Sequence, residues 1–64
     1  MRLKRIIIYP KDIQRITGKS ERYGRMVLQK IKTNLNKESH QLVTIEEYSN
    51  YAGVGVEAIV DFID

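Results

Sequence analysis

The chain has no cysteine and no tryptophan, and it has one histidine and one proline among 64 residues. Without cysteine it can form no disulfide, which fits a reducing compartment such as the cytoplasm. A dedicated zinc or iron–sulfur site is not expected either, because such sites are built mainly from cysteine and histidine. The composition therefore predicts a domain that holds no metal and no other cofactor.

Long apolar runs are missing as well. The N-terminal stretch MRLKRIII is basic and then apolar, but its run ends after three isoleucines at YPKD. That is too short for the apolar core of a secretion signal, and no later stretch approaches the roughly 20 apolar residues that cross a membrane. We expect a single cytoplasmic domain over residues 1–64, with no membrane partner.

Catalytic motifs are absent too. The sequence contains no P-loop, no Gly-rich dinucleotide fingerprint and no zinc-protease motif. Ser39 and His40 are neighbours in a polar linker, but a catalytic triad is a spatial arrangement that needs a third, orienting group. We therefore predict that the protein is not an enzyme.

Positive charge is confined to one half of the chain. All 11 Lys and Arg lie within residues 1–37 together with only two acids, so this half carries a formal charge of +9. Residues 38–64 contain six acids and no Lys or Arg, a formal charge of −6. Such asymmetry favours a basic half that faces a polyanion and a second half with another role. Chance, or attraction between the two halves, would give the same pattern.

The basic half has the pattern of two helices joined by a tight turn. The first helix is predicted over residues 9–17, with Pro10 and Asp12 suited to its first turn, and Gly18 ends it. Ser20 can cap a second helix, which should end near the polar stretch TNLNKESH. The apolar spacing of this second helix predicts a buried face formed by Gly24, Val27, Leu28, Ile31 and Leu35.

The acidic half repeats this organisation. Thr44 and Glu47 form the capping box of a helix that runs to Ala52 and breaks at Gly53. A shift of 35 residues aligns Asp12 with Glu47 and Gly18 with Gly53, which indicates similar architecture without duplication. A last helix is predicted to bury Val56, Ile59, Val60 and Ile63 on one face. Tyr9, Tyr48 and Tyr51 are expected to fill the core.

The fold class that follows is mainly α, with four short helices arranged as two helix-turn-helix-like pairs. The basic unit spans residues 9–35 and the acidic helical hairpin spans residues 41–64. Residues 4–8 (KRIII) read as a short β-branched strand. They could pair with residues 41–43 (QLV) in a small two-stranded β-ribbon.

The stretch DIQRITGKSERYGRMVLQKIK, residues 12–32, resembles the helix-turn-helix of small bacterial DNA-binding proteins, especially MerR-like and excisionase-like modules. Gly18 matches the turn glycine of those families, Gly24 the position where the two helices touch, and Ile13 and Val27 the flanking buried positions. A glycine inside a helix costs roughly 1 kcal/mol relative to alanine, and a close helix contact would justify Gly24. The resemblance implies a transcription regulator or excisionase-like accessory factor that inserts its second helix into the major groove of double-stranded DNA.

The resemblance also implies which side chains face the DNA. The groove-facing positions would be Ser20, Glu21, Arg22, Arg25, Met26 and Gln29. Arg can form two hydrogen bonds with guanine and Gln two with adenine, and Met26 could contact a thymine methyl. Lys19 and the helix N-terminus can hold a phosphate. Further candidates for phosphate contacts are Lys11, Arg15, Lys30 and Lys32. The same residues could also form an ordinary solvated face.

A second function comes from the acidic half. Its acids would repel a phosphate backbone, so this half could instead bind a protein partner or a second copy of the chain. Asp61 and Asp64 lie near a helix C-terminus, where the helix dipole disfavours acids, and a basic partner would relieve that cost. The alternative to DNA binding is thus a protein–protein interaction or self-association module that uses oppositely charged halves. Binding of structured RNA by the basic helix is a third possibility.

Overall fold

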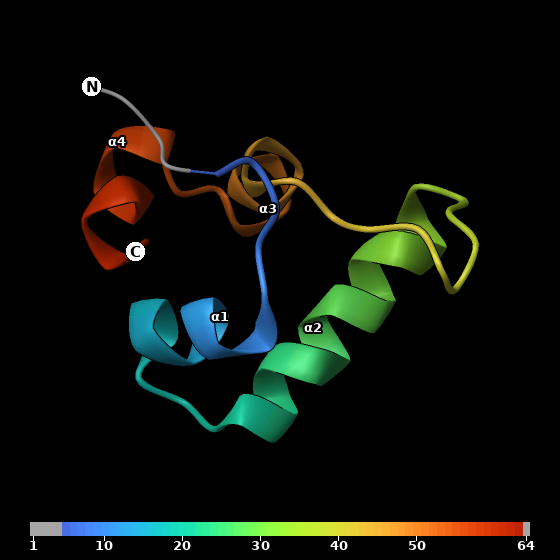
Figure 1. Ribbon diagram of the computed structural model, residues 1–64, viewed down its shortest axis with the longest axis horizontal. Coiled ribbons are helices and arrows are strands. Elements are labelled where there is room, and N and C mark those ends of the chain that lie inside the picture. Colours follow the sequence, from blue (N-terminus) through green and yellow to red (C-terminus); the bar gives the residue numbers. More distant parts are fainter. Residues whose placement is uncertain (1–4, 64) are drawn as a thin grey trace.

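A computed structural model describes residues 5–63 of the chain. This part is mainly α and measures 30 × 22 × 19 Å (Figure 1). Its helices are α1 (Pro10–Thr17), α2 (Glu21–Asn34), α3 (Ile45–Ala52) and α4 (Val56–Ile59), and α4 continues into a 3-10 turn, η1 (Val60–Phe62). None of these helices is long and apolar enough to cross a lipid bilayer. The expected class and helix order are confirmed.

Helix α1 begins and ends as the local sequence predicts. Tyr9 is extended and its N–H donates to Asp12 Oδ2 over 2.8 Å, so the carboxylate satisfies a backbone donor at the start of the helix. Pro10 occupies the first helical position, where its missing N–H costs nothing. The helix ends at Gly18, whose φ of 74° lies in the left-handed region that glycine adopts without strain.

Helix α2 is the longest element, with 14 residues. Ser20 caps it, because its hydroxyl accepts the Tyr23 N–H over 3.1 Å. Gly24 lies against the start of α1, where a Cβ built on it would stand 2.5 Å from the Pro10 carbonyl oxygen. The close contact expected at this glycine is therefore present, and it fixes how α2 packs against α1.

The expected β-ribbon is reduced to one contact. Ile7 and Thr44 form an isolated antiparallel bridge, flanked by the hydrogen bonds Ile8 N–H to Val43 O (3.0 Å) and Ile45 N–H to Ile6 O (2.7 Å). No strand extends from it within residues 5–63, and Lys4 lies outside the described residues. The paired stretch is short because α3 starts directly after Thr44 and α1 starts three residues after Ile7. It holds the beginnings of these two helices together.

Helix α3 is capped as predicted, whereas α4 is shorter than predicted. Thr44 Oγ1 accepts the Glu47 N–H over 3.0 Å, and Glu47 Oε1 accepts the Thr44 N–H over 2.9 Å. The helix ends at Gly53, with a φ of 73°. Gly55 begins α4 without a side-chain cap, and α4 has one turn before it tightens into η1. Only the middle and end of this segment are buried, at Ile59 and Ile63.

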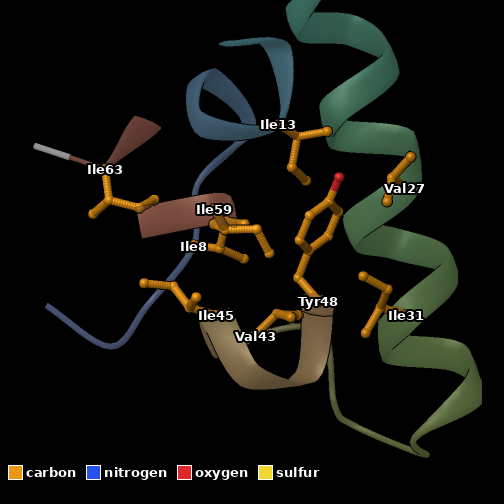
Figure 2. Packing of buried hydrophobic residues seen from close by; sticks show 9 residues of the cluster. All are labelled: Ile8, Ile13, Val27, Ile31, Val43, Ile45, Tyr48, Ile59 and Ile63. Atoms are coloured by element: carbon orange, nitrogen blue, oxygen red, sulfur yellow. The ribbon is translucent and has the colours of Figure 1, made fainter. Parts of the chain in front are cut away.

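One core joins the two halves. Its buried residues are Ile8, Ile13, Val27, Ile31, Val43, Ile45, Tyr48, Ile59 and Ile63. Figure 2 shows Tyr48 reaching from α3 toward Val27 and Ile31 of α2, with Ile59 on its other side. The helices of the two predicted units thus form one domain around a shared centre.

Three residues predicted to be in the core are exposed instead. Leu35 lies beyond the last turn of α2, at its C-cap. Tyr9 precedes α1, and its ring lies 5.1 Å from the Arg5 guanidinium. Tyr51 is 44% exposed at the edge between α3 and α2. Leu35 continues the apolar spacing of α2 and the two tyrosines are among the few aromatic residues, but no neighbouring element covers any of the three.

Candidate nucleic-acid interface

The tight pairing of α1 and α2 leaves one side of α2 in solvent. Gly24, Val27 and Ile31 face the protein, and a helix advances about 100° per residue. The opposite side therefore carries Arg22, Arg25, Met26 and Gln29, all exposed. These four residues are termed the outer face of α2. Lys19 and Ser20, in the turn before α2, are exposed at its N-terminal end.

Arg25 pairs with Glu21 among the described residues. Its guanidinium donates to Glu21 Oε2 over 3.2 Å, one turn earlier on the same helix. Such an exposed ion pair stabilises a helix by only about 0.3–0.5 kcal/mol. Arg25 can therefore leave Glu21 for a stronger acceptor at little cost.

Glu21 also lies at a hollow between the starts of α1 and α2. The hollow has a volume of about 380 Å³, and its lining includes Lys11 and Arg15. Both are candidates for phosphate contacts and are exposed. Glu21 reduces the positive potential between them, so this side of α2 is less basic than a count of Lys and Arg suggests.

The remaining candidates differ in how far they are available to a ligand. Lys19 lies over the ring of Tyr23, 5.4 Å from its centre, while Tyr23 packs against the edge of the core. Lys30 is exposed on the side of α2 that faces α3. Lys32 is half-buried, and its ammonium donates to the Ser39 carbonyl over 2.9 Å. Lys32 thus anchors the linker and would have to break that bond to reach a phosphate.

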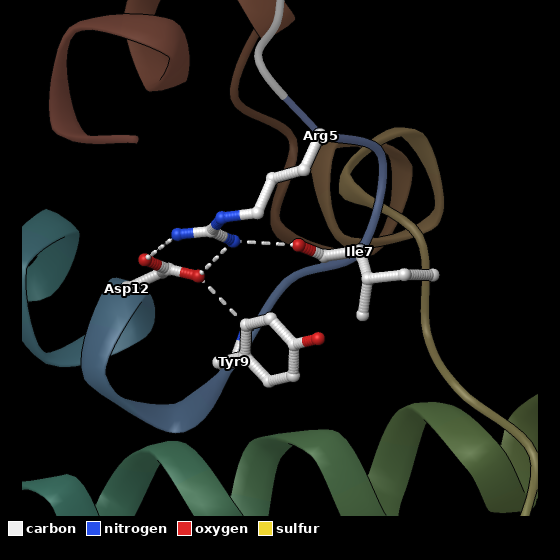
Figure 3. A network of polar contacts seen from close by, with 4 residues as sticks. All are labelled: Arg5, Ile7, Tyr9 and Asp12. Carbon is white, nitrogen blue, oxygen red and sulfur yellow. Dashed lines mark hydrogen bonds and ion pairs between the residues drawn. The ribbon is translucent and has the colours of Figure 1, made fainter. Parts of the chain in front are cut away.

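Arg5 belongs to the structure of the domain (Figure 3). Its guanidinium donates to both carboxylate oxygens of Asp12, each over 2.8 Å, and to the Ile7 carbonyl over 2.7 Å. Burial by itself raises the pKa of Asp12, but the hydrogen bonds from Arg5 and the Tyr9 N–H outweigh it and lower the pKa. No local pattern in the sequence predicts this contact, which spans seven residues and a change of direction at Pro10.

A second ion pair joins a lysine of the basic half to a glutamate of the acidic half. Lys37 Nζ lies 3.2 Å from Glu47 Oε2, so the linker after α2 is tied to the first turn of α3. The pKa of Glu47 is lowered, chiefly because the Thr44 N–H donates to its carboxylate and secondarily because Lys37 is close. Attraction between the two halves therefore accounts for part of the charge asymmetry, through Lys37 and Glu47.

Among the described residues of the second half, Glu38 is exposed in the linker after α2, and the other exposed acids lie on α3, α4 and η1. Glu46 is on α3, and Glu57 and Asp61 are on α4 and η1. In Figure 1, α4 lies on the opposite side of the molecule from α2. Within residues 5–63, no three His, Cys, Asp or Glu residues gather in a way that could hold a metal ion. The outer face of α2 is thus basic and polar, and the acids of α4 and η1 lie on the far side of the molecule.

No known protein family, curated protein or solved structure matches this chain. Its function must therefore be inferred from the geometry of these residues.

Proposed function

We propose that this protein binds double-stranded DNA through the outer face of α2, as a helix-turn-helix transcription regulator or an excisionase-like accessory factor. The main support for this proposal is the close contact at Gly24. Because Gly24 has no side chain, α2 packs directly on the Pro10 backbone, and the pair presents Arg22, Arg25 and Gln29 together on its solvent side. A generic amphipathic helix has no need of such a contact.

The chemistry of the outer face suits the major groove. Fourteen residues make α2 about 21 Å long. A recognition helix reaches base edges with its N-terminal residues, which here include Arg22 and Arg25, and Gln29 follows one turn later on the same face. Arg22 and Arg25 would each bond guanine O6 and N7, and Gln29 would bond adenine N6 and N7. Met26 offers an apolar surface to a thymine methyl. Lys19 and the α2 N-terminus would hold a phosphate.

The proposal is tested by titrating the ¹⁵N-labelled protein with mixed-sequence duplex DNA at two salt concentrations and following the amide signals. We expect shifts concentrated between Lys19 and Gln29. With about four phosphate contacts, log K against log salt should have a slope of roughly −3 to −4, because each neutralised phosphate releases a counterion. Unchanged amide signals at low salt would reject DNA binding.

A second candidate function is a protein contact through the end of the chain. Phe62 is a large apolar residue that is exposed beside Asp61, and Asp64 lies outside the described residues. An exposed phenylalanine beside an acid suits a basic and apolar partner, which includes the basic face of a second copy. Self-association of this kind predicts a sedimentation coefficient that increases with protein concentration and decreases with salt.

A further inference from the structure

The side of α2 that faces α3 is hollowed, and Tyr51 of α3 lines both parts of the hollow. One part, of about 260 Å³, is lined by Tyr51 with Gln29, Lys30, Thr33 and Asn34. A second part, of about 370 Å³, continues toward the N-terminus of α2 and includes Tyr51, Lys30 and Met26. These two parts together are termed the Tyr51 groove. Tyr51 is 44% exposed there, so the helix pair leaves a large aromatic side chain in contact with solvent.

The Tyr51 groove is continuous with the outer face of α2. Met26 and Gln29 belong to both surfaces, and Lys30 lines both parts of the groove. No acid lines either part. On α3, Glu47 lies one turn before Tyr51, but it is paired with Lys37. Tyr51 also lines a separate hollow that includes Glu47, but on the side of the Tyr51 groove its surroundings are positive to neutral, although Tyr51 belongs to the acidic half of the chain.

The position of the groove relative to α2 points to a phosphate backbone. Glu21 and Lys30 are nine residues apart, which is about two and a half turns and places them on opposite sides of the helix. Lys11 and Arg15 lie on the Glu21 side, at the hollow between α1 and α2. A helix in the major groove, which is about 12 Å wide, has one phosphate backbone on each side. The Lys30 side then faces the second backbone.

We infer that Tyr51 binds a DNA phosphate beside Lys30, its hydroxyl donating a hydrogen bond to a phosphate oxygen. The inference rests on the proposed function, and it adds the acidic half of the chain to the DNA interface. Tyrosine hydroxyls are among the groups that contact phosphates in protein–DNA complexes. The contact is neutral, so it should strengthen binding without releasing a counterion. Lys30 beside it should both strengthen binding and release a counterion.

The test compares Tyr51→Phe, which removes only the hydroxyl, with the unmodified full chain. Binding to a fluorescently labelled mixed-sequence duplex is measured by anisotropy at several salt concentrations. We expect Tyr51→Phe to weaken binding about two- to tenfold, the range for one hydrogen bond, with the salt slope unchanged. Lys30→Ala should weaken binding and also reduce the steepness of the slope by about 1. Asn50→Ala is the matched control, because Asn50 is the preceding, exposed residue of α3 and does not line the Tyr51 groove.

The outcomes separate this inference from the proposed function. If Arg22→Ala and Arg25→Ala weaken binding while Tyr51→Phe and Tyr51→Ala leave it unchanged, DNA binding stands and the role of Tyr51 is rejected. If the unmodified chain binds no duplex, both proposals are rejected. If Tyr51→Ala leaves DNA binding unchanged but abolishes self-association in sedimentation, the groove is a protein-binding surface and the inference is overturned. Thermal unfolding of each variant shows whether a loss of binding reflects a loss of folding.

Discussion

The two halves of the molecule follow the same plan with different results. Each begins with an eight-residue helix that has an acid at its third position, Asp12 in α1 and Glu47 in α3. Each first helix ends at a glycine with positive φ, Gly18 or Gly53. The second helices then differ, because α2 has 14 residues and α4 has only four. Similar first helices are therefore followed by a long helix with one exposed face in the first half and by a single helical turn in the second.

The difference lies in how each second helix begins and what it contacts. Ser20 caps α2 with its hydroxyl, whereas Gly55 gives α4 no side-chain cap. Gly24 brings α2 against the backbone of α1, and the outer face then remains free for a ligand. In contrast, α4 and the residues after it supply Ile59 and Ile63 to the core. Both halves thus supply residues to the shared core, but only the first half has a long second helix with an exposed outer face.

The largest effect on the free energy of unfolding should come from breaking the ion pair at the start of α1 and not the one at the start of α3. The Asp12 side chain is 4% exposed and is held by Arg5, whereas the Glu47 side chain is 29% exposed and is held by Lys37. Arg5→Met leaves a buried carboxylate without its cation and should cost about 2–4 kcal/mol of unfolding free energy. Lys37→Met should cost less than about 1 kcal/mol. Urea denaturation measures the unfolding free energy of both variants. Equal losses would contradict the prediction that the more buried carboxylate depends more strongly on its cation.

The next largest effect on stability should come from substitution of Gly24, compared with the same substitution at Gly55. A Cβ on Gly24 would meet the Pro10 backbone, whereas a Cβ on Gly55 would meet only the end of the Glu57 side chain, which can move away. We expect Gly24→Ala to destabilise the domain by about 1–3 kcal/mol through overpacking. Gly55→Ala should be close to neutral. If Gly24→Ala instead stabilised the protein by about 1 kcal/mol, as alanine does in an open helix, the close contact would be refuted.

The parts of the fold that the sequence predicts well are those set by local chemistry. The turn at Gly18, the cap at Ser20 and the capping box of Thr44 and Glu47 each depend on residues within one turn of one another. The close contact at Gly24 was also predictable, because a glycine inside an apolar helical face needs a reason. The exposure of Arg22, Arg25 and Gln29 then follows from the helical period.

The features that the sequence does not predict depend on contacts between elements. Arg5 and Asp12 are joined across the turn into α1, and Tyr51 and Leu35 are exposed because no neighbouring element covers them. A helical period shows which residues share a face but not where the packing partner ends. The Tyr51 groove therefore became visible only with the relative positions of α2 and α3.

The affinity for DNA should depend on the outer face of α2 and not on the exposed acid of α4. Arg25→Ala removes a proposed guanine contact and should cost about 1–3 kcal/mol on a preferred duplex selected from random sequences, with relaxed preference at one base pair. Glu57→Gln removes an exposed acid on the far side and should not weaken binding. Competition binding with the selected and scrambled duplexes measures both. Unchanged affinity and preference for Arg25→Ala would remove Arg25 from the set of base-reading residues.

The smallest effect is the pH dependence of stability, to which the two first-turn acids contribute differently. The folded-state pKa values of Asp12 and Glu47 both lie below their ordinary values of 3.8 and 4.5. Each group therefore stabilises the fold above its ordinary pKa, and this contribution is lost as the pH falls through the lower folded-state value. On acidification Glu47 should lose its contribution first, because its ordinary pKa is higher. Urea midpoints measured from neutral pH to well below the ordinary Asp12 pKa of 3.8 should fall less steeply for Asp12→Asn and Glu47→Gln than for the unmodified protein. Curves parallel to that of the unmodified protein would show that neither carboxylate is linked to folding.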